Sequence, residues 1–420
     1  MNSLGMEAAA LGRSPAPLRI TIASGLLWLA VVLPVIGTVW LGSVSTNDFA
    51  AALQFAFVLV MAPEAAIELK HAWSFRVMRI AAFASMLCMA SWHFFQGPFL
   101  AIPRSSDYLV LILFAAAAVG WFRQVKDTGF EWVFRAKAVA LVVAMVWIGL
   151  TWWLLDDTAD GQRIFRHTPI YRHVRHLSYD LFAVTALAIY FSSVAPTKTR
   201  WQFALLFLAL GYLTTWSAGR GGMLALAVFV AVLVASSKRE FWGGRNLLPF
   251  GFFLLGCLLT TLDGNADRLA MRVDQTLSGS VNHISSGRIG IWTGSLERLM
   301  QSTPAVFFGY GPDALLRLGI PANLPGNGGI VQPHSAIIQW LLEFGVVGTL
   351  AIVGVLATSC RQALGVLAGN SELSSQKTAA ALLLALLVYA LVDGIFYHAI
   401  PLTLVVLTCA YLAAQQGRRR

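Results

Sequence analysis

The chain has 420 residues, of which 57% are hydrophobic and only 12% charged, and its mean hydropathy is +0.69. This composition excludes an ordinary soluble domain and indicates a membrane protein. The formal net charge is +10. In a membrane protein such an excess largely sets the orientation of the chain, so no nucleic-acid partner needs to be invoked.

Apolar segments of membrane-spanning length recur along the whole chain. Because ~20 apolar residues cross the ~30 Å hydrocarbon core of a bilayer, we predict an all-α, polytopic integral membrane protein with about twelve transmembrane helices. Their approximate bounds are Ile20 to Gly42, Phe49 to Ile67, Val77 to Phe95, Ser106 to Phe122, Ala138 to Leu155, Leu181 to Ala195, Trp201 to Ser217, Gly222 to Ala235, Leu247 to Leu262, Ser335 to Ala357, Thr378 to Val392 and Ala399 to Ala414.

Lysine and arginine are concentrated in alternate connections between these segments. The basic groups that share one side are Arg13 and Arg19; Lys70, Arg76 and Arg79; Arg123, Lys126, Arg135 and Lys137; Lys198 and Arg200; Lys238, Arg239 and Arg245; Arg361 and Lys377; and Arg418 to Arg420. Basic residues of short loops remain on the cytoplasmic side of a membrane. We therefore expect both termini to be cytoplasmic.

Two connections on the opposite side are longer than a helical hairpin needs, Asp156 to Asp180 and Asp263 to His334. Long extramembrane segments cross regardless of their charge, so they do not overturn the orientation. We divide the chain accordingly. Residues 1–262 hold the first membrane helices with a basic periplasmic loop at 156–180, residues 263–334 form a large helical periplasmic loop with catalytic elements, and residues 335–420 hold the last membrane helices.

In this topology Arg220 lies on the outer side of the membrane, whereas the basic residues of the short connections listed above lie on the cytoplasmic side. It stands in the run Trp216-Ser-Ala-Gly-Arg-Gly-Gly222, where the chain must turn sharply between two spans. Glycines at 221 and 222 would let a ligand approach the backbone closely. The simpler alternative is an arginine that snorkels at a helix end.

Arg288 is the second outer arginine, in the run Ser285-Ser-Gly-Arg-Ile-Gly-Ile-Trp292. The apolar residues Ile289, Trp292, Leu296 and Leu299 predict an amphipathic helix that begins after Ser285 or Ser286, with Arg288 in its first turn. A helix N-terminus attracts anions, and a guanidinium adds a bidentate donor for phosphate. Two glycine-flanked arginines on one face favour a shared anion site over two snorkelling side chains.

His334 follows Pro333, which favours a helix start at the outer end of a span. A helix N-terminus disfavours the imidazolium and keeps the ring neutral, as a general base requires. A histidine that only anchors the helix at the membrane interface is the alternative. Glu343 lies more than two turns deeper, where a carboxylate paired inside the bundle is at least as plausible as a functional one.

The carboxylates of the two long connections favour a metal only weakly. Asp263, Asp267 and Asp274 imitate a calcium loop, but Arg268 stands where the turn needs glycine. Asp156, Asp157 and Asp160 are typical of a solvated loop or a helix cap. We therefore expect no metal and no cofactor.

The ordered motifs of the second half, about Trp201 to Arg420, resemble the O-antigen ligase and polymerase superfamily of bacterial envelope glycosyltransferases. The matching elements are Arg220 in Ser-x-Gly-Arg-Gly-Gly, the Gly-Arg-x-x-x-Trp of Gly287 to Trp292, the turn Gly309-Tyr-Gly311 and the block Pro-His-Ser that continues to Glu343-Phe-Gly-x-x-Gly348. The resemblance implies a glycosyltransferase-C-like helical fold. It also implies a periplasmic active site in the bacterial inner membrane.

Such enzymes transfer a glycan from undecaprenyl diphosphate to an acceptor hydroxyl, and the ligase branch uses the lipid A-core oligosaccharide. Negative charge develops on the leaving diphosphate and must be stabilised. We assign this role to Arg220 and Arg288, with the backbone of Gly221 and Gly222, in place of a metal. His334 would deprotonate or orient the acceptor.

A ligase and a polymerase share this donor and differ in the acceptor. Clustered arginines suit a phosphate-rich acceptor, so the outer basic segment favours a ligase, with Arg163, Arg166, Arg172 and Arg175 as candidate acceptor ligands. An amphipathic helix on anionic headgroups is the alternative for this segment. A polymerase, a protein O-oligosaccharyltransferase and a twelve-span transporter remain open, although the single large loop argues against paired transporter halves.

Overall fold

The computed structural model describes residues 16–40, 46–73, 98–154, 174–194, 199–237, 247–262, 288–320, 330, 332–369 and 374–416. These residues form helices and their connections, and no strand occurs among them. The all-α prediction is confirmed for this part of the chain. The helices are α2 (Ala16–Trp40), α3 (Thr46–Val60), α4 (Ala62–Trp73), α6 (Pro98–Val125), α7 (Asp127–Leu154), α9 (Val174–Val194), α10 (Arg200–Ser217), α11 (Arg220–Ser236), α13 (Leu247–Thr260), α16 (Arg288–Met300), α17 (Thr303–Phe308), α18 (Ala314–Arg317), α19 (Ala336–Leu367), α20 (Ser375–Val392) and α21 (Ala399–Gln416).

Six of these helices are long and apolar enough to cross a membrane, within α6, α7, α9, α19, α20 and α21. Helices α3 and α4 would add a seventh span if their pair, bent by 85°, crosses as one unit. Shorter apolar helices lie within α2, α11 and α13. The expected span at Val77 to Phe95 is outside the described residues. The chain is thus a multi-pass membrane protein, while the count of about twelve spans is not confirmed.

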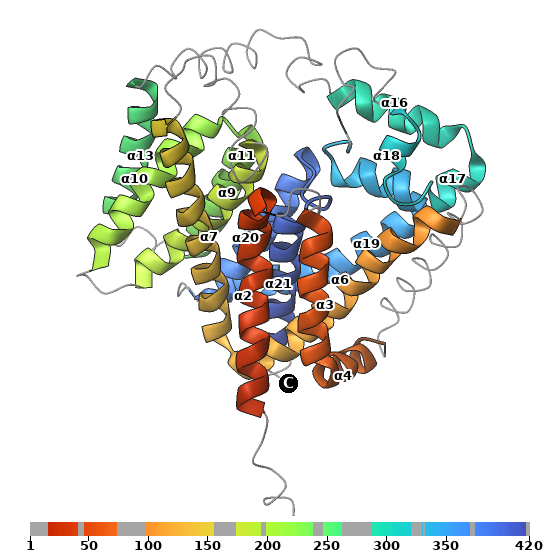
Figure 1. Ribbon diagram of the computed structural model, residues 1–420, viewed down its shortest axis with the longest axis horizontal. Helices are drawn as coiled ribbons and strands as arrows, with labels where there is room; N and C mark the ends of the chain where they lie inside the picture. The colour runs from red at the N-terminus through yellow and green to blue at the C-terminus, as the bar shows by residue number, and fades with distance from the viewer. Residues whose placement is uncertain are drawn as a thin grey trace, which may run out of the picture.

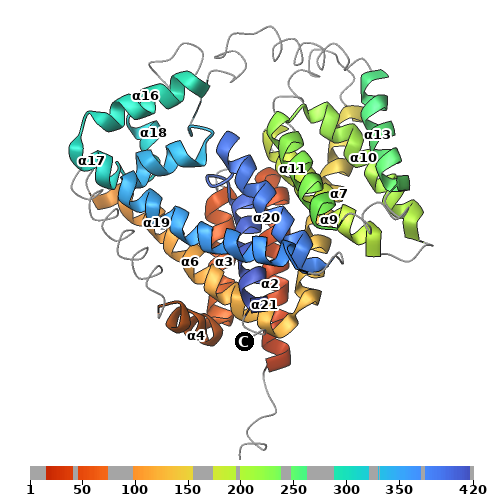
Figure 2. The same ribbon diagram turned by 180° about the vertical axis from the view of Figure 1, so that it is seen from behind.

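Helices α20 and α21 form the centre of the bundle, with α2 and α3 beside them (Figure 1). Helices α10, α11 and α13 lie on one flank and α16 to α18 on the other, both toward the upper end. Seen from behind, α19 extends from the α16–α18 group toward α20 (Figure 2). The start of α2 and the end of α21 both lie at the lower end of the bundle.

Alanines let the central helices approach closely. Ala379, Ala380, Ala381 and Ala385 of α20 have no exposed surface. In a membrane, where lipid is as apolar as a leucine side chain, such small residues favour close van der Waals packing between helices.

At the lower end, Gln415 Nε2 of α21 donates a hydrogen bond of 3.2 Å to Asp127 Oδ1 of α7. The hydroxyl groups of Ser375 and Tyr411 lie 2.7 Å apart and join α20 to α21.

Lys137 and Asp180 form an ion pair inside the bundle, which corrects the sequence prediction. Both were placed in connections on opposite sides of the membrane. Helix α7 instead begins at Asp127 and α9 at Val174, so each residue lies within a helix. Their side chains are 3% and 1% exposed. Because each charge is neutralised by the other, both can leave water, and Lys137 is no orientation signal.

The outer helices are joined to α19 through two glycines in the left-handed region. Gly309 has φ +74° and Gly345 has φ +63°, the latter at a kink within α19. A Cβ on Gly309 would lie 2.3 Å from the carbonyl oxygen of Glu343, and one on Gly345 would lie 2.4 Å from the backbone of Phe307. Tyr310 N–H donates to Leu342 O at 2.8 Å across this contact. Both glycine motifs therefore fix the outer helices against a membrane helix.

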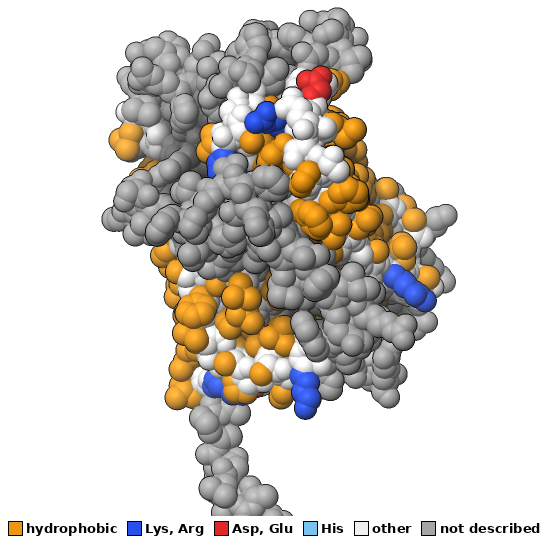
Figure 3. All heavy atoms as spheres, turned by 90° about the vertical axis from the view of Figure 1, so that its right-hand side faces the viewer, with side chains coloured by type: hydrophobic (Ala, Val, Ile, Leu, Met, Phe, Trp, Pro, Cys, Tyr) orange, Lys and Arg blue, Asp and Glu red, His pale blue; other side chains and the backbone are white. Residues whose placement is uncertain are grey.

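The outer helices have a small core of their own, formed by Ile291, Leu299, Ala305, Tyr310, Ala314, Leu315, Ile320 and Leu342. The buried stripe of α16 is Ile291, Ser295 and Leu299. Of the apolar residues predicted to form the buried face of this helix, only Leu299 is fully buried, and Leu296 is 41% exposed. On the flank that carries these helices, hydrophobic side chains cover much of the described surface, and Lys and Arg side chains are scattered among them (Figure 3).

Candidate functional site

Several helix ends meet at the upper end of the bundle and bring charged side chains together. Arg175 lies in the first turn of α9, Arg220 begins α11 and Arg288 begins α16. His334 precedes α19, and Asp393 follows α20. The residues of this arginine cluster thus come from segments spread over more than half of the chain.

His334 is the central contact of the cluster. Its side chain is buried, and its Nε2 lies 2.8 Å from Arg175 Nη1. On its other side, Nδ1 lies 3.3 Å from Asp393 Oδ1. A guanidinium can only donate, so we assign the lone pair to Nε2 and the proton to Nδ1. This is the tautomer of a neutral base whose acceptor atom is covered by an arginine.

The surroundings of His334 keep the ring neutral. Burial lowers the pKa of His334 below its usual 6.5, and the charge of Arg175 lowers it further, while Asp393 opposes both. The sequence prediction assigned this effect to a helix N-terminus. Helix α19 begins only at Ala336, with Ser335 as its N-cap, so His334 lies outside the helix. Its φ of +53° is unusual for a residue with a side chain and shows that the backbone holds it in a strained conformation.

Asp393 is the carboxylate that the sequence analysis missed. It accepts hydrogen bonds from Tyr179 Oη at 3.2 Å and from Gly394 N–H at 2.8 Å. Burial alone would raise its pKa, but the hydrogen bond with His334 and the charges of Arg288 and Arg175 hold the pKa below the usual range. The available signal was a lone acidic residue at the outer end of a predicted span, on the face that carries the arginines.

Arg288 contributes positive charge that is not fully paired within the cluster. Its Nη1 donates to the backbone oxygen of Val392 at the end of α20. Its Nε is buried and has no hydrogen-bond partner in the described part of the chain. Burial lowers the pKa of Arg288, and Arg175 and Arg220 lower it further against the attraction of Asp393. Arg288 thus interacts with two further arginines and with the carboxylate of Asp393, and the anion site stays a prediction.

Arg220 begins α11 directly after a sharp turn, as predicted, with Gly219 as N-cap and Ala218 in the left-handed region. The neighbouring glycines have a different reason from the expected one. A Cβ on Gly219 would lie 2.3 Å from Ser178 Oγ, and one on Gly221 would lie 2.6 Å from the ring of Tyr389. They allow α11 to pack against α9 and α20. Ligand binding by the backbone of Gly221 and Gly222 stays a prediction.

Further polar contacts support the cluster, and none was predicted from the sequence. Trp292 Nε1 donates to Pro333 O at 2.7 Å and so joins α16 to the segment that holds His334. Gln332 Nε2 lies 2.7 Å from His398 Nε2, whose ring centroid is 4.4 Å from that of His176. Burial, together with the charge of His176, keeps the pKa of His398 well below its usual value.

Some predicted residues fall outside the described part. Among the four candidate acceptor ligands only Arg175 is described, and it contacts His334. Arg163, Arg166 and Arg172 lie outside the described residues, as does the stretch Asp263 to Asp274. The structure therefore moves Arg175 from a separate basic surface to the candidate active site.

Glu343 lies in a second polar group, separate from the arginine cluster. Its carboxylate accepts from Tyr108 Oη at 3.1 Å, from Asp313 N–H at 3.1 Å and from Gln339 Nε2 at 3.5 Å. These donors are all neutral. The described residues thus give Glu343 hydrogen bonds in place of the ion pair considered from the sequence.

Comparison with known proteins agrees with the resemblance found in the sequence. Residues 203–353 match the family model described as O-Antigen ligase. A search of curated proteins gives no significant match. The matched range includes Arg220, Arg288, His334 and Glu343, whereas Arg175 and Asp393 lie on either side of it. The match confirms the suspected family relationship for residues 203–353.

Proposed function

We propose that the chain is a glycosyltransferase of lipopolysaccharide assembly, because residues 203–353 match the O-antigen ligase family model. In this proposal it transfers an O-antigen polysaccharide from undecaprenyl diphosphate to the lipid A-core oligosaccharide. The reaction takes place at the periplasmic face of the bacterial inner membrane. Its fold would be glycosyltransferase-C-like, with residues 263–334 as a periplasmic subdomain.

The excess of positive charge in the arginine cluster is the observation that carries this proposal. Arg175 and Arg288 both act on the carboxylate of Asp393, Arg220 adds a third positive charge near Arg288, and the buried Nε of Arg288 lacks a partner among the described residues. A diphosphate supplies several acceptor oxygens and negative charge. It would satisfy the open donor and relieve the repulsion between the arginines.

The contact between Arg175 and His334 suggests how the donor activates the base. Without substrate, Arg175 covers the Nε2 atom that must accept a proton. A bound diphosphate offers Arg175 a stronger, charge-assisted partner and would draw it off the ring. His334 would then become a competent base only when the donor is in place.

The proposed chemical step needs no further reactant. An acceptor hydroxyl oxygen forms a bond to the anomeric carbon of the donor glycan while the bond from that carbon to the diphosphate oxygen breaks. The hydroxyl proton moves to Nε2 of His334, and Asp393 stabilises the resulting imidazolium. The arginines stabilise the charge that develops on the leaving undecaprenyl diphosphate.

The acceptor distinguishes the ligase from its relatives. The proposed phosphate-binding segment retains Arg163, Arg166 and Arg172 as candidate acceptor ligands, while we reassign Arg175 to the donor. Deletion of the gene followed by gel analysis of lipopolysaccharide tests the assignment. Unmodified core together with accumulated lipid-linked polymer supports a ligase. Core that carries a single repeat unit would identify a polymerase, and an unchanged lipopolysaccharide pattern would overturn both.

The orientation can be tested at two exposed positions. Glu297 lies on α16 beside the cluster and Gln416 ends α21 at the opposite end of the bundle. In a cysteine-free background, Glu297→Cys should react with a membrane-impermeant thiol reagent added to the periplasm. Gln416→Cys should react only after the inner membrane is permeabilised. The reverse pattern would place the candidate site in the cytoplasm.

A further inference from the structure

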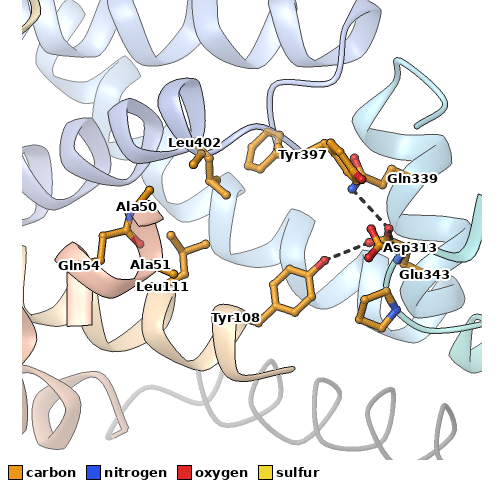
Figure 4. A pocket seen from close by; sticks show the side chains of 13 residues that line it. Ala50, Ala51, Gln54, Tyr108, Leu111, Asp313, Gln339, Glu343, Tyr397 and Leu402 are labelled. Atoms are coloured by element: carbon orange, nitrogen blue, oxygen red, sulfur yellow. Dashed lines mark hydrogen bonds between the residues drawn. The ribbon is translucent and has the colours of Figure 1, made fainter. Parts of the chain in front are cut away.

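A pocket separate from the arginine cluster lies between α3, α6, α19 and the start of α21, beside the turn at Pro312 (Figure 4). About 630 Å³ of atom-free space lies in and in front of it, and this figure includes open solvent at its mouth. Its side chains are unevenly distributed. Glu343, Gln339 and Tyr108 gather at one end, and Ala50, Leu111 and Leu402 lie toward the other.

The polar end of this pocket has an acceptor atom that the protein leaves unused. Gln339 is only 4% exposed, and its Nε2 donates toward Glu343. Its Oε1 is buried and has no hydrogen-bond partner among the described residues. A buried amide oxygen without a partner costs about 1–3 kcal/mol. Since this side chain lines a pocket, a ligand that donates a hydrogen bond would remove that cost.

The charge of the pocket limits which ligand can bind there. Glu343 and Asp313 lie in this lining, and no Lys, Arg or His is among the described residues that line it. The described lining therefore offers no cationic donor to a phosphate. A neutral ligand rich in hydroxyl groups could donate to Glu343 and Gln339, while the rings of Tyr108, Phe396 and Tyr397 offer apolar faces.

We propose that this pocket binds a neutral sugar ring of one of the two glycan substrates. The proposal rests on the transferase function proposed above and adds a specificity site to it. One short segment connects the two sites, since Phe396 and Tyr397 line the pocket while Asp393 and His398 belong to the arginine cluster. The sugar would thus be held beside the diphosphate site and would place the glycan for transfer.

The variant Gln339→Leu tests the subsite, because it keeps the side-chain volume and removes both polar atoms. Among the described residues, the side chain of Gln339 makes one hydrogen bond, the 3.5 Å contact to Glu343. Tyr108→Phe is a second variant that keeps the ring and removes one donor to Glu343. Gln362→Leu is the matched control, since Gln362 is a partly exposed glutamine near the other end of α19, where it donates a hydrogen bond of 3.0 Å to Gln416.

The assay uses purified enzyme in nanodiscs with a lipid-linked glycan donor and a core-lipid acceptor, each also prepared with a truncated glycan. We expect Gln339→Leu to raise KM for one of the two substrates about tenfold, with kcat within about twofold, and Gln362→Leu to change neither. The substrate whose KM rises identifies the source of the sugar. Removing that sugar should make wild type and variant equal.

Three outcomes would overturn the subsite. The first is an unchanged KM in both pocket variants. The second is a KM that rises equally for full-length and truncated glycans, and the third is a fall in kcat with no change in KM. An equal rise would indicate that the pocket holds a lipid instead. Absence of transfer by the wild-type enzyme would contradict the proposed function itself, so the two failures are distinguishable.

Discussion

The molecule contains two groups of buried charges that differ in balance. In the ion pair of Lys137 and Asp180, one cation faces one anion, and both side chains are at most 3% exposed. In the arginine cluster, Arg175 and Arg288 act on Asp393, Arg220 lies near enough to repel Arg288, and the buried Nε of Arg288 lacks a partner in the described part. The ion pair is balanced within the protein. In our proposal, an anion from outside completes the arginine cluster.

The two groups are also linked through one helix. Asp180 lies on α9 next to Tyr179, which donates to Asp393, and five residues after Arg175. By fixing α9 against α7, the ion pair would hold Arg175 and Tyr179 toward the cluster. A balanced pair therefore suits a positioning role, whereas an unbalanced cluster suits substrate binding.

The largest expected effect is on the base of the unbalanced cluster. We expect His334→Gln to retain binding of the undecaprenyl diphosphate donor and to lower transfer by roughly 10²–10⁴-fold, the usual contribution of a positioned base. Donor binding and single-turnover transfer by purified enzyme would be measured in parallel. Near-normal turnover would show that His334 only anchors the segment before α19.

The same residue gives a pH dependence. The neutral ring is the active form, so the rate should fall as pH drops through the pKa of His334. Because burial lowers this pKa below 6.5, wild-type activity should persist to a pH below 6.5 and decline only in more acidic buffer. In His334→Gln the residual rate should lack this decline. An identical acid limb in both enzymes would assign it to another group.

The next effect tests the geometry of the arginines. Lysine retains the charge but cannot form a bidentate contact with phosphate. We expect Arg288→Lys and Arg220→Lys each to lower transfer by roughly 10²–10³-fold with unchanged expression. Arg298→Lys, at an exposed position on α16, is the matched control and should retain activity. Wild-type rates in both site variants would reject a phosphate-binding role.

The comparison also shows what the sequence could predict. Arg220 and Arg288 were accessible because each opposed a regular topology signal and stood beside glycine. The position of Arg288 at the start of α16 followed from a helix-start pattern, whereas Arg220 was expected in a turn before Gly222 and is the first residue of α11. The position of Asp393 gave a signal, but the joint role of Asp393 and Tyr179 could not be predicted. It arises from a hydrogen bond between residues that lie 214 positions apart in the sequence.

Lys137 and Asp180 were misplaced for a related reason. A span predicted from hydropathy ends where a charged residue occurs, because an isolated charge in lipid has a high free energy. It cannot detect that two such charges neutralise each other across neighbouring helices. The glycines at 309 and 345 were recognised in the sequence as parts of motifs. Only the structure shows that the backbone around each glycine packs directly against the backbone around the other.

A smaller effect on transfer is expected when the balanced pair is replaced as a whole. Lys137→Met alone leaves a buried carboxylate unpaired and should lower the free energy of unfolding by about 3–5 kcal/mol. The double variant Lys137→Met with Asp180→Leu should recover most of that stability and at least partial activity. Thermal unfolding in detergent and the transfer assay would measure both. A double variant as unstable as the single one would contradict a purely structural pair.

The smallest expected effect comes from removing divalent ions. The leaving diphosphate must be stabilised by positive charge, and Arg175, Arg220 and Arg288 supply that charge as groups that cannot dissociate. We therefore predict that transfer by purified enzyme survives EDTA with less than about a twofold change in rate, because one arginine contact alone is expected to contribute ~10²-fold. Arg288→Lys assayed with and without added Mg²⁺ provides the control, since an ion that substitutes for the missing contact would raise only the variant's rate. If chelation instead abolishes wild-type transfer and a divalent ion restores it, the arginine cluster binds the donor but a metal carries the leaving-group charge.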